Sequence, residues 1–114
     1  MELTYTELEG GMRMLRLAGR LDVAGAAAIE TRFAGYCAVE GGRVLVDMAA
    51  VDFMSSIGIR MLVLNANALV GRGGKMVLLN PTPNVRSVLE VSGIPSIIPM
   101  YDGLESAVTL LSVA

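Results

Sequence analysis

The segment from Val44 to Arg60 constrains the fold of this chain more than any other. It begins with an apolar run, Val44–Val46, that is typical of an interior strand covered on both faces. After a short loop, Ser55 and Ser56 stand directly before an apolar helical segment. We therefore expect the end of a strand to deliver two hydroxyl groups to a helix N-terminus. Free backbone N–H groups and the helix dipole meet there, so a serine can cap the helix or hold a phosphate without disrupting it.

Composition excludes several classes of function. The chain has 114 residues, of which 54% are hydrophobic, so it can build one core without a metal or a disulfide. A formal net charge of −2 without a Lys/Arg cluster makes nucleic acid and anionic membranes poor partners. Histidine is absent, which removes the commonest general base and most metal sites. We expect a protein that is not an enzyme and that has no catalytic residue, cofactor or metal site.

Cysteine usage and the apolar segments indicate where the protein resides. Cys37 is the single cysteine, which excludes an intramolecular disulfide, favours a reducing compartment and is more typical of a small buried apolar residue than of a nucleophile. Glu2, Glu7 and Glu9 interrupt any apolar N-terminal run, so we predict no signal peptide. The longest apolar stretch, 61–70, contains two asparagines and is too short to span a bilayer. A cytoplasmic protein without direct membrane insertion is expected.

Hydrophobic periodicity and turn residues predict the order of elements. The predicted strands cover residues 3–8, 12–18, 44–46 and 75–79, and the predicted helices cover 24–39, 56–70, 83–91 and 104–111. Ile97–Ile98 is predicted as a short edge strand, and Asp22 and Thr82 as helix caps. The order β-β-α-β-α-β-α-(β)-α predicts a single α/β domain over residues 1–114. Its mixed, mainly parallel sheet would open with one hairpin and be packed with helices.

Four stretches, taken in order, resemble the STAS domain of bacterial anti-sigma factor antagonists. They are Leu-Ala-Gly-Arg-Leu-Asp at 17–22, the strand, loop and serine motif at 44–59, Gly-Gly-Lys-Met-Val-Leu at 73–78, and Val-Arg-Ser-Val-Leu-Glu-Val-Ser-Gly-Ile at 85–94. Their joint order and spacing cover nearly the whole chain. The resemblance therefore implies a single STAS domain over residues 1–114.

The resemblance also implies a modification site. It places the phosphoacceptor at Ser56 and the motif glycine at Gly58. Three residues depart from the common pattern: Ser55 stands where Asp is usual, Ile57 where a smaller residue is usual, and Arg20 where many members have an acidic residue. Ile57 would narrow the access of a kinase, and Arg20 would change the preference for partners.

Membership of this family would imply a partner-switching cycle. The unmodified protein would bind an anti-sigma factor serine kinase and free its sigma factor. The kinase, using ATP, would phosphorylate Ser56 and so end the complex, and a PP2C-like serine phosphatase would restore the hydroxyl. On its own the protein is expected to be a monomer.

The residues near Ser56 also have plainer interpretations. Serine is a common helix cap, and from the residues alone capping is the more frequent role for both serines; the resemblance favours phosphorylation at Ser56 and leaves Ser55 as the cap. Asp22 is expected at the same end of the sheet, as a helix cap, as a partner contact, or as both. Asp47 and Asp52 would either form an acidic rim or simply keep a loop soluble.

The helix predicted at 56–70 is expected to have two apolar faces. The face toward the core would contain Ile59, Leu62, Val63, Ala66 and Leu69, and the outward face would contain Ile57, Met61, Leu64 and Ala68. An outward apolar face beside the serines suits a docking surface, and its alternative is a more deeply buried helix. The residues expected to bind a partner are Asp22, Asp52, Ser55, Ser56, Ile57, Arg60, Met61 and Leu64.

Two other kinds of function remain open from the sequence. A STAS subunit or scaffold of a lipid-transport ATPase or of a stress-signalling complex would not need an active phosphosite. A small nucleotide-binding protein or enzyme is the third interpretation. The glycine-rich stretch 71–74 is its main support, but that stretch lacks the Gly-Lys-Ser/Thr ending of a phosphate-binding loop and follows a helix, so it is more typical of a helix stop.

Overall fold

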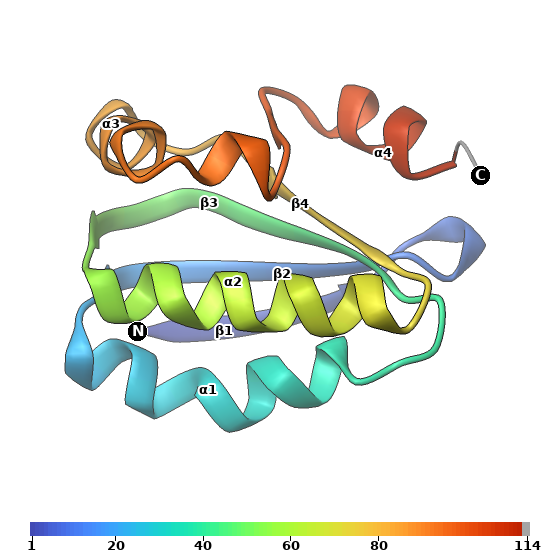
Figure 1. Cartoon of the computed structure of the whole chain (residues 1–114), viewed down its shortest axis with the longest axis horizontal. Coiled ribbons are helices and arrows are strands. Elements are labelled where there is room, and N and C mark those ends of the chain that lie inside the picture. The colour runs from blue at the N-terminus through green and yellow to red at the C-terminus, as the bar shows by residue number, and fades with distance from the viewer. Residues whose placement is uncertain (113–114) are drawn as a thin grey trace.

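The computed structural model describes residues 1–112 as a five-stranded sheet with four α-helices (Figure 1). The strands are β1 (Glu2–Glu7), β2 (Arg13–Leu21), β3 (Arg43–Met54), β4 (Lys75–Leu79) and β5 (Met100–Tyr101). The helices are α1 (Val23–Cys37), α2 (Ser56–Gly71), α3 (Pro83–Val91) and α4 (Leu104–Ser112), with short 3-10 turns η1 (Glu9–Gly11) and η2 (Ile94–Ser96). The strands lie in the order β1-β2-β3-β4-β5; β1 is antiparallel to β2 and the other pairs are parallel. The predicted fold class is confirmed.

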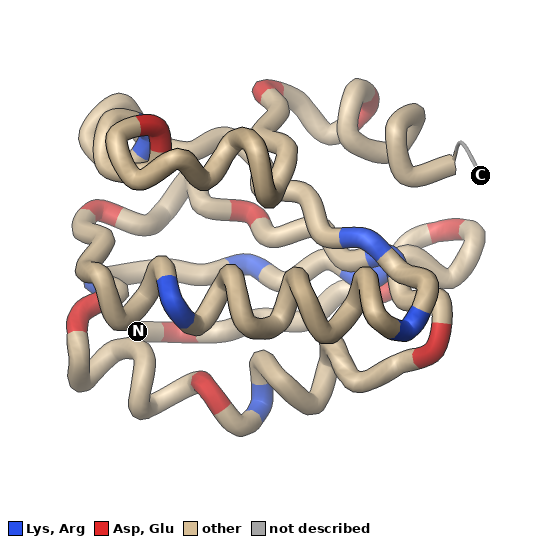
Figure 2. The backbone as a smooth tube through the Cα atoms, viewed as in Figure 1, with Lys and Arg blue, Asp and Glu red and all other residues tan. Residues whose placement is uncertain are grey.

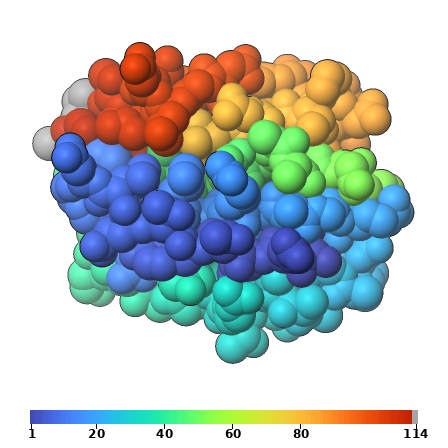
Figure 3. All heavy atoms as spheres, turned by 180° about the vertical axis from the view of Figure 1, so that it is seen from behind, coloured from blue at the N-terminus to red at the C-terminus, as the bar shows by residue number. Residues whose placement is uncertain are grey.

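The helices form two layers. Helices α1 and α2 lie side by side on one side of the sheet, and α3 and α4 lie on the other (Figure 1). Seen from behind, the hairpin of β1 and β2 forms the edge between these layers (Figure 3). Its tight turn contains Gly10 and Gly11 at φ 76° and 77°, a conformation that glycine adopts without steric cost. The opening hairpin predicted from the sequence is therefore confirmed.

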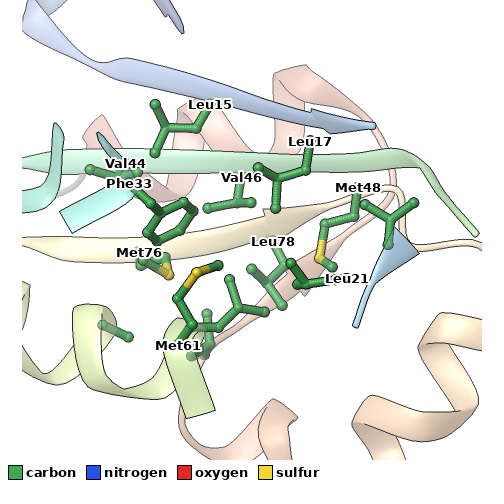
Figure 4. Packing of buried hydrophobic residues seen from close by; sticks show 14 of the residues in the cluster. Leu15, Leu17, Leu21, Phe33, Val44, Val46, Met48, Met61, Met76 and Leu78 are labelled. Carbon is green, nitrogen blue, oxygen red and sulfur yellow. The ribbon is translucent and has the colours of Figure 1, made fainter. Parts of the chain in front are cut away.

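Alternate residues of the central strands fill the space on either side of the sheet. Toward α1 and α2, Val46, Met76 and Leu78 pack with Leu15, Leu17 and Phe33 (Figure 4). Toward α4, Leu45, Val77 and Leu79 pack with Ala107 and Leu111. This arrangement matches the continuous apolar runs of β3 and β4, because both faces of an interior parallel strand are covered.

Cys37 belongs to the core, as the sequence predicts. It is buried at the end of α1, and burial raises the pKa of its thiol to about 12. The thiol is therefore protonated at neutral pH, which agrees with a packing role.

Two of the predicted elements differ from the structure. The residues after Val46, predicted as a loop, continue β3 to Met54, because β2 also extends to Leu21 and the two strand ends pair. The edge strand predicted at Ile97–Ile98 is wrong. Those residues follow η2, and β5 begins at Met100, where pairing with β4 becomes possible after Pro99.

The cap predicted at Thr82 is only partly right. Thr82 occupies the N-cap position of α3, but its hydroxyl makes no capping bond. It instead donates to the Val51 carbonyl at 3.3 Å. Thr82 thus ties the start of α3 to β3.

Two further structural features concern membranes and metals. Within residues 1–112, no helix has both the length and the apolar character needed to cross a bilayer. The same residues contain no group of three or more His, Cys, Asp or Glu side chains placed to hold a metal ion.

Candidate functional site

Two strand-to-helix junctions meet at one end of the sheet. Leu21, the last residue of β2, is the register partner of Met54, the last residue of β3. Helices α1 and α2 begin within two residues of these positions. The backbone N–H and the Oγ of Ser55 both donate to the Leu21 carbonyl, at 3.0 and 2.8 Å. The two helix N-termini are therefore held together by hydrogen bonds as well as by the sheet.

Asp22 caps α1, as predicted. Its Oδ1 accepts a hydrogen bond from the Gly25 amide at 2.8 Å. This bond, assisted by the neighbouring Arg20 guanidinium, lowers the pKa of the Asp22 carboxyl. The α1 end of the site consequently carries a negative charge at neutral pH.

Ser55 caps α2, also as predicted. Its Oγ accepts from the Gly58 amide at 3.3 Å while donating to Leu21. Gly58 itself is closely packed, since a Cβ at that position would lie 2.6 Å from Cγ of Leu21. Such a distance requires the neighbouring side chains to move, so the motif glycine is explained by packing between the two junctions.

Ser56 is the first residue of α2 and is exposed to solvent. Within residues 1–112 its hydroxyl has no hydrogen-bond partner, in contrast to that of Ser55. The Gly58 and Ile59 amides bond to Ser55, so the amides of Ser56 and Ile57 are the first-turn donors left without a partner in that range. The first turn of α2 contains no acidic residue. The position therefore combines an accessible hydroxyl with free N–H groups and the positive end of a helix dipole.

An arginine and an aromatic ring, which sequence reasoning did not connect, complete this end of the sheet. The Arg20 guanidinium lies over the Phe53 ring, 4.2 Å from its centroid, and its Nε is 3.5 Å from Asp22 Oδ2. Phe53 is 38% exposed, which is unusual for phenylalanine. The register of β2 with β3 makes Arg20 and Phe53 partners, and only a correct prediction of both strand ends would have found this pair.

The acidic rim predicted around Ser56 is corrected by the structure. Asp47 is only 7% exposed and lies in the middle of β3, where it accepts hydrogen bonds from Arg16 Nε at 3.1 Å and from the Ala49 amide at 3.0 Å. Asp47 therefore stabilises the sheet rather than forming a rim. Asp52 is exposed near the end of β3. Acidic and basic positions are mixed where α1 and α2 begin (Figure 2), so the end of the sheet does not form a field of one sign.

The outward apolar face predicted on α2 is partly wrong. Ile57 and Leu64 are 43% and 57% exposed, and Arg60 lies exposed between them. Met61, however, is only 6% exposed and belongs to the core. The reason is α1, which packs against α2 and covers the side of the helix on which Met61 lies. Met61 is the floor of a groove between the two helices rather than a residue of an outer surface.

The mixed sheet with its opening hairpin, the two helix layers and the serine pair at the start of α2 define the class of protein. The chain belongs to the STAS domain family, whose family model matches residues 5–107. Within the curated proteins it is similar to BtrV of Bordetella bronchiseptica, which is named an anti-sigma factor antagonist. The two are 33% identical over 114 residues, covering 100% of this chain and 97% of BtrV.

Solved structures share the fold at lower sequence identity. An anti-sigma factor antagonist STAS domain protein from Planctomyces limnophilus aligns with a TM-score of 0.85 at 20% identity, over 96% of this chain and 97% of that one. The unphosphorylated anti-sigma factor antagonist SpoIIAA aligns with a TM-score of 0.77 at 24% identity, over 95% and 93%. The phosphorylated form of SpoIIAA from Bacillus aligns with a TM-score of 0.72 at 24% identity, over 96% and 98%.

Proposed function

We propose that this STAS domain, spanning residues 1–114, is a cytoplasmic anti-sigma factor antagonist that acts by partner switching. The unphosphorylated protein binds an anti-sigma factor serine kinase and frees its sigma factor. Phosphorylation of Ser56 ends that complex, and a PP2C-like serine phosphatase reverses the modification. The names of the curated relatives support the antagonist role, and the geometry of Ser56 supports the switch.

The observation that carries the proposal is the contrast between the two serines. Both hydroxyls lie at the start of α2, but that of Ser55 is engaged with Leu21 and Gly58, and that of Ser56 is free and exposed. A kinase can therefore reach Ser56 without breaking a hydrogen bond of the fold. Modification of Ser55 would remove a donor to Leu21 at the point where the two junctions are joined.

A phosphate on Ser56 changes the interface rather than the fold. It adds about −1.5 to −2 charges at neutral pH, which the free first-turn amides and the helix dipole stabilise. Because acidic and basic side chains are mixed at this end of the sheet, the phosphate itself supplies the change: it repels an acidic partner surface, and an apolar partner surface would have to desolvate it. SpoIIAA keeps the same fold in its unphosphorylated and phosphorylated forms, which supports a switch without refolding.

In this proposal the chain contributes a hydroxyl acceptor and no catalytic group. The kinase supplies ATP and the machinery of phosphoryl transfer. The protein is therefore a substrate and a binding partner of the kinase. Its regulatory effect comes from the difference between the affinities of its unphosphorylated and phosphorylated forms for that kinase.

Incubation with a candidate anti-sigma factor kinase and ATP, followed by intact and peptide mass measurement, tests the proposal. We expect one phosphate on Ser56 and loss of kinase affinity. The Ser56→Ala variant should bind the kinase and accept no phosphate, and Ser55→Ala, its matched control, should still be phosphorylated at Ser56. Binding without phosphorylation would contradict the switch. If the protein neither bound the kinase nor accepted a phosphate, the result would favour a scaffold or transporter subunit instead.

A further inference from the structure

A groove of about 630 Å³ runs between α1 and α2, beside the proposed switch. Its α1 wall contains Ala26, Glu30 and Ala34, which recur every four residues and therefore lie on one helix face. Its α2 wall contains Ile57, Arg60 and Leu64. Two alanines of α1 thus face Ile57 and Leu64 of α2 across a floor formed by Met61, and each wall also carries one charged side chain. The sequence pattern at 26, 30 and 34 could have indicated this wall, but only together with the packing of α1 on α2.

The form of the groove fits a helix. Both walls are α-helices, whose interior backbone N–H and C=O groups are already bonded, so the groove offers no main-chain pairing to an extended peptide. Two adjacent helices instead present ridges between which the side chains of a third helix can pack. The exposed Ile57 and Leu64 would lose their contact with water in such a complex.

The charges on the walls indicate the chemistry of the occupant. Glu30 lies on the α1 wall and Arg60 on the α2 wall, and both are exposed. Neither forms an ion pair within residues 1–112, where the pairs are Arg16–Asp47, Arg20–Asp22 and Arg86–Asp102. An amphipathic helix with a basic residue on one flank and an acidic residue on the other would complement both walls.

The groove is continuous with the proposed phosphorylation site. Ile57 follows Ser56 directly, and Arg60 lies four residues after Ser56 on the same face of α2. A phosphate on Ser56 would therefore compete with a carboxylate of the occupant for the Arg60 guanidinium. Occupation of the groove and phosphorylation of Ser56 would oppose one another.

We propose that the groove between α1 and α2 binds one amphipathic helix of the anti-sigma factor partner, with an acidic side chain at Arg60 and a basic side chain at Glu30. This inference rests on the proposed function and names the surface that the partner uses. The partner's apolar side chains contact Ile57 and Leu64, and its helix lies along the groove.

The test fills the groove and measures the affinity of the purified candidate anti-sigma factor kinase. Ala34→Phe fills it at a position far from Ser56, and Ala28→Phe, on the exposed outer side of α1, is the matched control. We expect Ala34→Phe to weaken binding by about 10-fold or more and Ala28→Phe to leave it unchanged. Circular dichroism melting of both variants shows whether they fold equally well. Glu30→Lys and Arg60→Glu, which retain the apolar walls, should each weaken binding by about fivefold.

A Ser56→Asp variant in the same assay separates the two proposals. Loss of affinity in Ser56→Asp but not in Ala34→Phe would overturn the groove proposal and retain the switch. Loss in Ala34→Phe alone would support the groove and contradict the switch. A photo-crosslinker at position 34 should mark one helix of the partner. Crosslinking to a strand or loop, or to a second copy of this chain, would overturn the proposal.

Discussion

The starts of α1 and α2 are built on the same plan but differ in charge. Each helix follows a strand at the same end of the sheet, and each is capped by a side chain that accepts from the amide three residues later. In both, that amide belongs to a glycine against which neighbouring atoms pack closely. The cap of α1 is the carboxylate of Asp22, whereas α2 has the hydroxyl of Ser55 and no acidic residue in its first turn.

This difference assigns a separate role to each junction. The N-terminus of α1 has its counter-charge built in, so its electrostatics do not depend on a modification. The N-terminus of α2 has no such charge, and in the proposed switch it would gain one only when Ser56 is phosphorylated. The two adjacent junctions would then provide one constant and one variable charge at the proposed binding surface.

The largest expected effects on stability come from replacing Gly25 and Gly58, the glycines whose amides bond to the two caps. In Gly25→Ala the new Cβ would collide with the carbonyl oxygen of Arg20, so the backbone has to move. We expect a loss of about 3 kcal/mol in the free energy of unfolding. In Gly58→Ala the Cβ meets the side chains of Leu21 and Met54, which can shift, and a loss of about 1.5 kcal/mol is expected. Urea unfolding of each variant measures these values.

Gly35→Ala is the matched control for both glycine variants. Gly35 lies within α1, and a Cβ there would meet nothing within 4 Å. Alanine should therefore stabilise the helix by about 0.5 to 1 kcal/mol. Equal tolerance of alanine at 25, 35 and 58 would show that the two junctions are not packed as described.

The next largest effect separates the two serines. Ser55→Ala removes the cap of α2 and should reduce stability by about 1 kcal/mol, while the Leu21 carbonyl keeps its bond from the Ser55 amide. Ser56→Ala removes an exposed hydroxyl without a partner in the described residues and should change stability by less than about 0.5 kcal/mol. Thermal and urea unfolding distinguish the two. A larger loss in Ser56→Ala than in Ser55→Ala would contradict the division of roles between cap and acceptor.

These two serines also show how far the sequence could predict the site. The Ser-Ser pair before an apolar helix correctly predicted a strand end followed by a capped helix, because both signals are local. Asp22 was predicted as a cap for the same reason. The position of Asp22 at the same end of the sheet as the two serines was also expected, since the carboxyl ends of parallel strands lie at one edge. The hydrogen bonds that join Ser55 to Leu21 were not predicted.

The parts of the site that depend on packing could not be predicted in this way. Strand β3 continues through residues 47–54, which were predicted as a loop, because they pair with β2, and this extension brings Phe53 under Arg20. Asp47 appears as a loop acid in the sequence but lies in the strand with Arg16 as its partner. Met61 fits an outward stripe until α1 covers it. In each case a contact between distant segments decides the outcome.

A smaller effect is expected when α2 is given the negative charge that its N-terminus lacks. Ser56→Asp places a carboxylate at the first position of α2, where the helix dipole stabilises an anion by about 0.5 kcal/mol. We expect a slightly higher melting temperature at low salt and a smaller gain at high salt, because screening weakens the interaction. Ser56→Asn, of similar size and without charge, is the control. Destabilisation in Ser56→Asp alone would mean that repulsion from Asp22 exceeds the dipole term, so the site would hold a phosphate poorly.

The smallest effect concerns pH and would show that the two caps differ in the way proposed. The Gly25 amide lowers the pKa of Asp22 in the folded state. A lowered pKa adds stability above the pKa of the unfolded carboxyl, about 3.9, and this stability is lost as pH falls through the folded pKa.

Asp22→Asn keeps an oxygen acceptor for Gly25 but cannot titrate. Its stability deficit relative to the native protein should therefore be present at about pH 7 and shrink toward about pH 3. Ser55 does not titrate in this range, so the deficit of Ser55→Ala should stay nearly constant in the same urea series. Parallel pH profiles for both variants would show that the Asp22 charge does not stabilise α1, and the contrast between a constant and a variable charge would then fail.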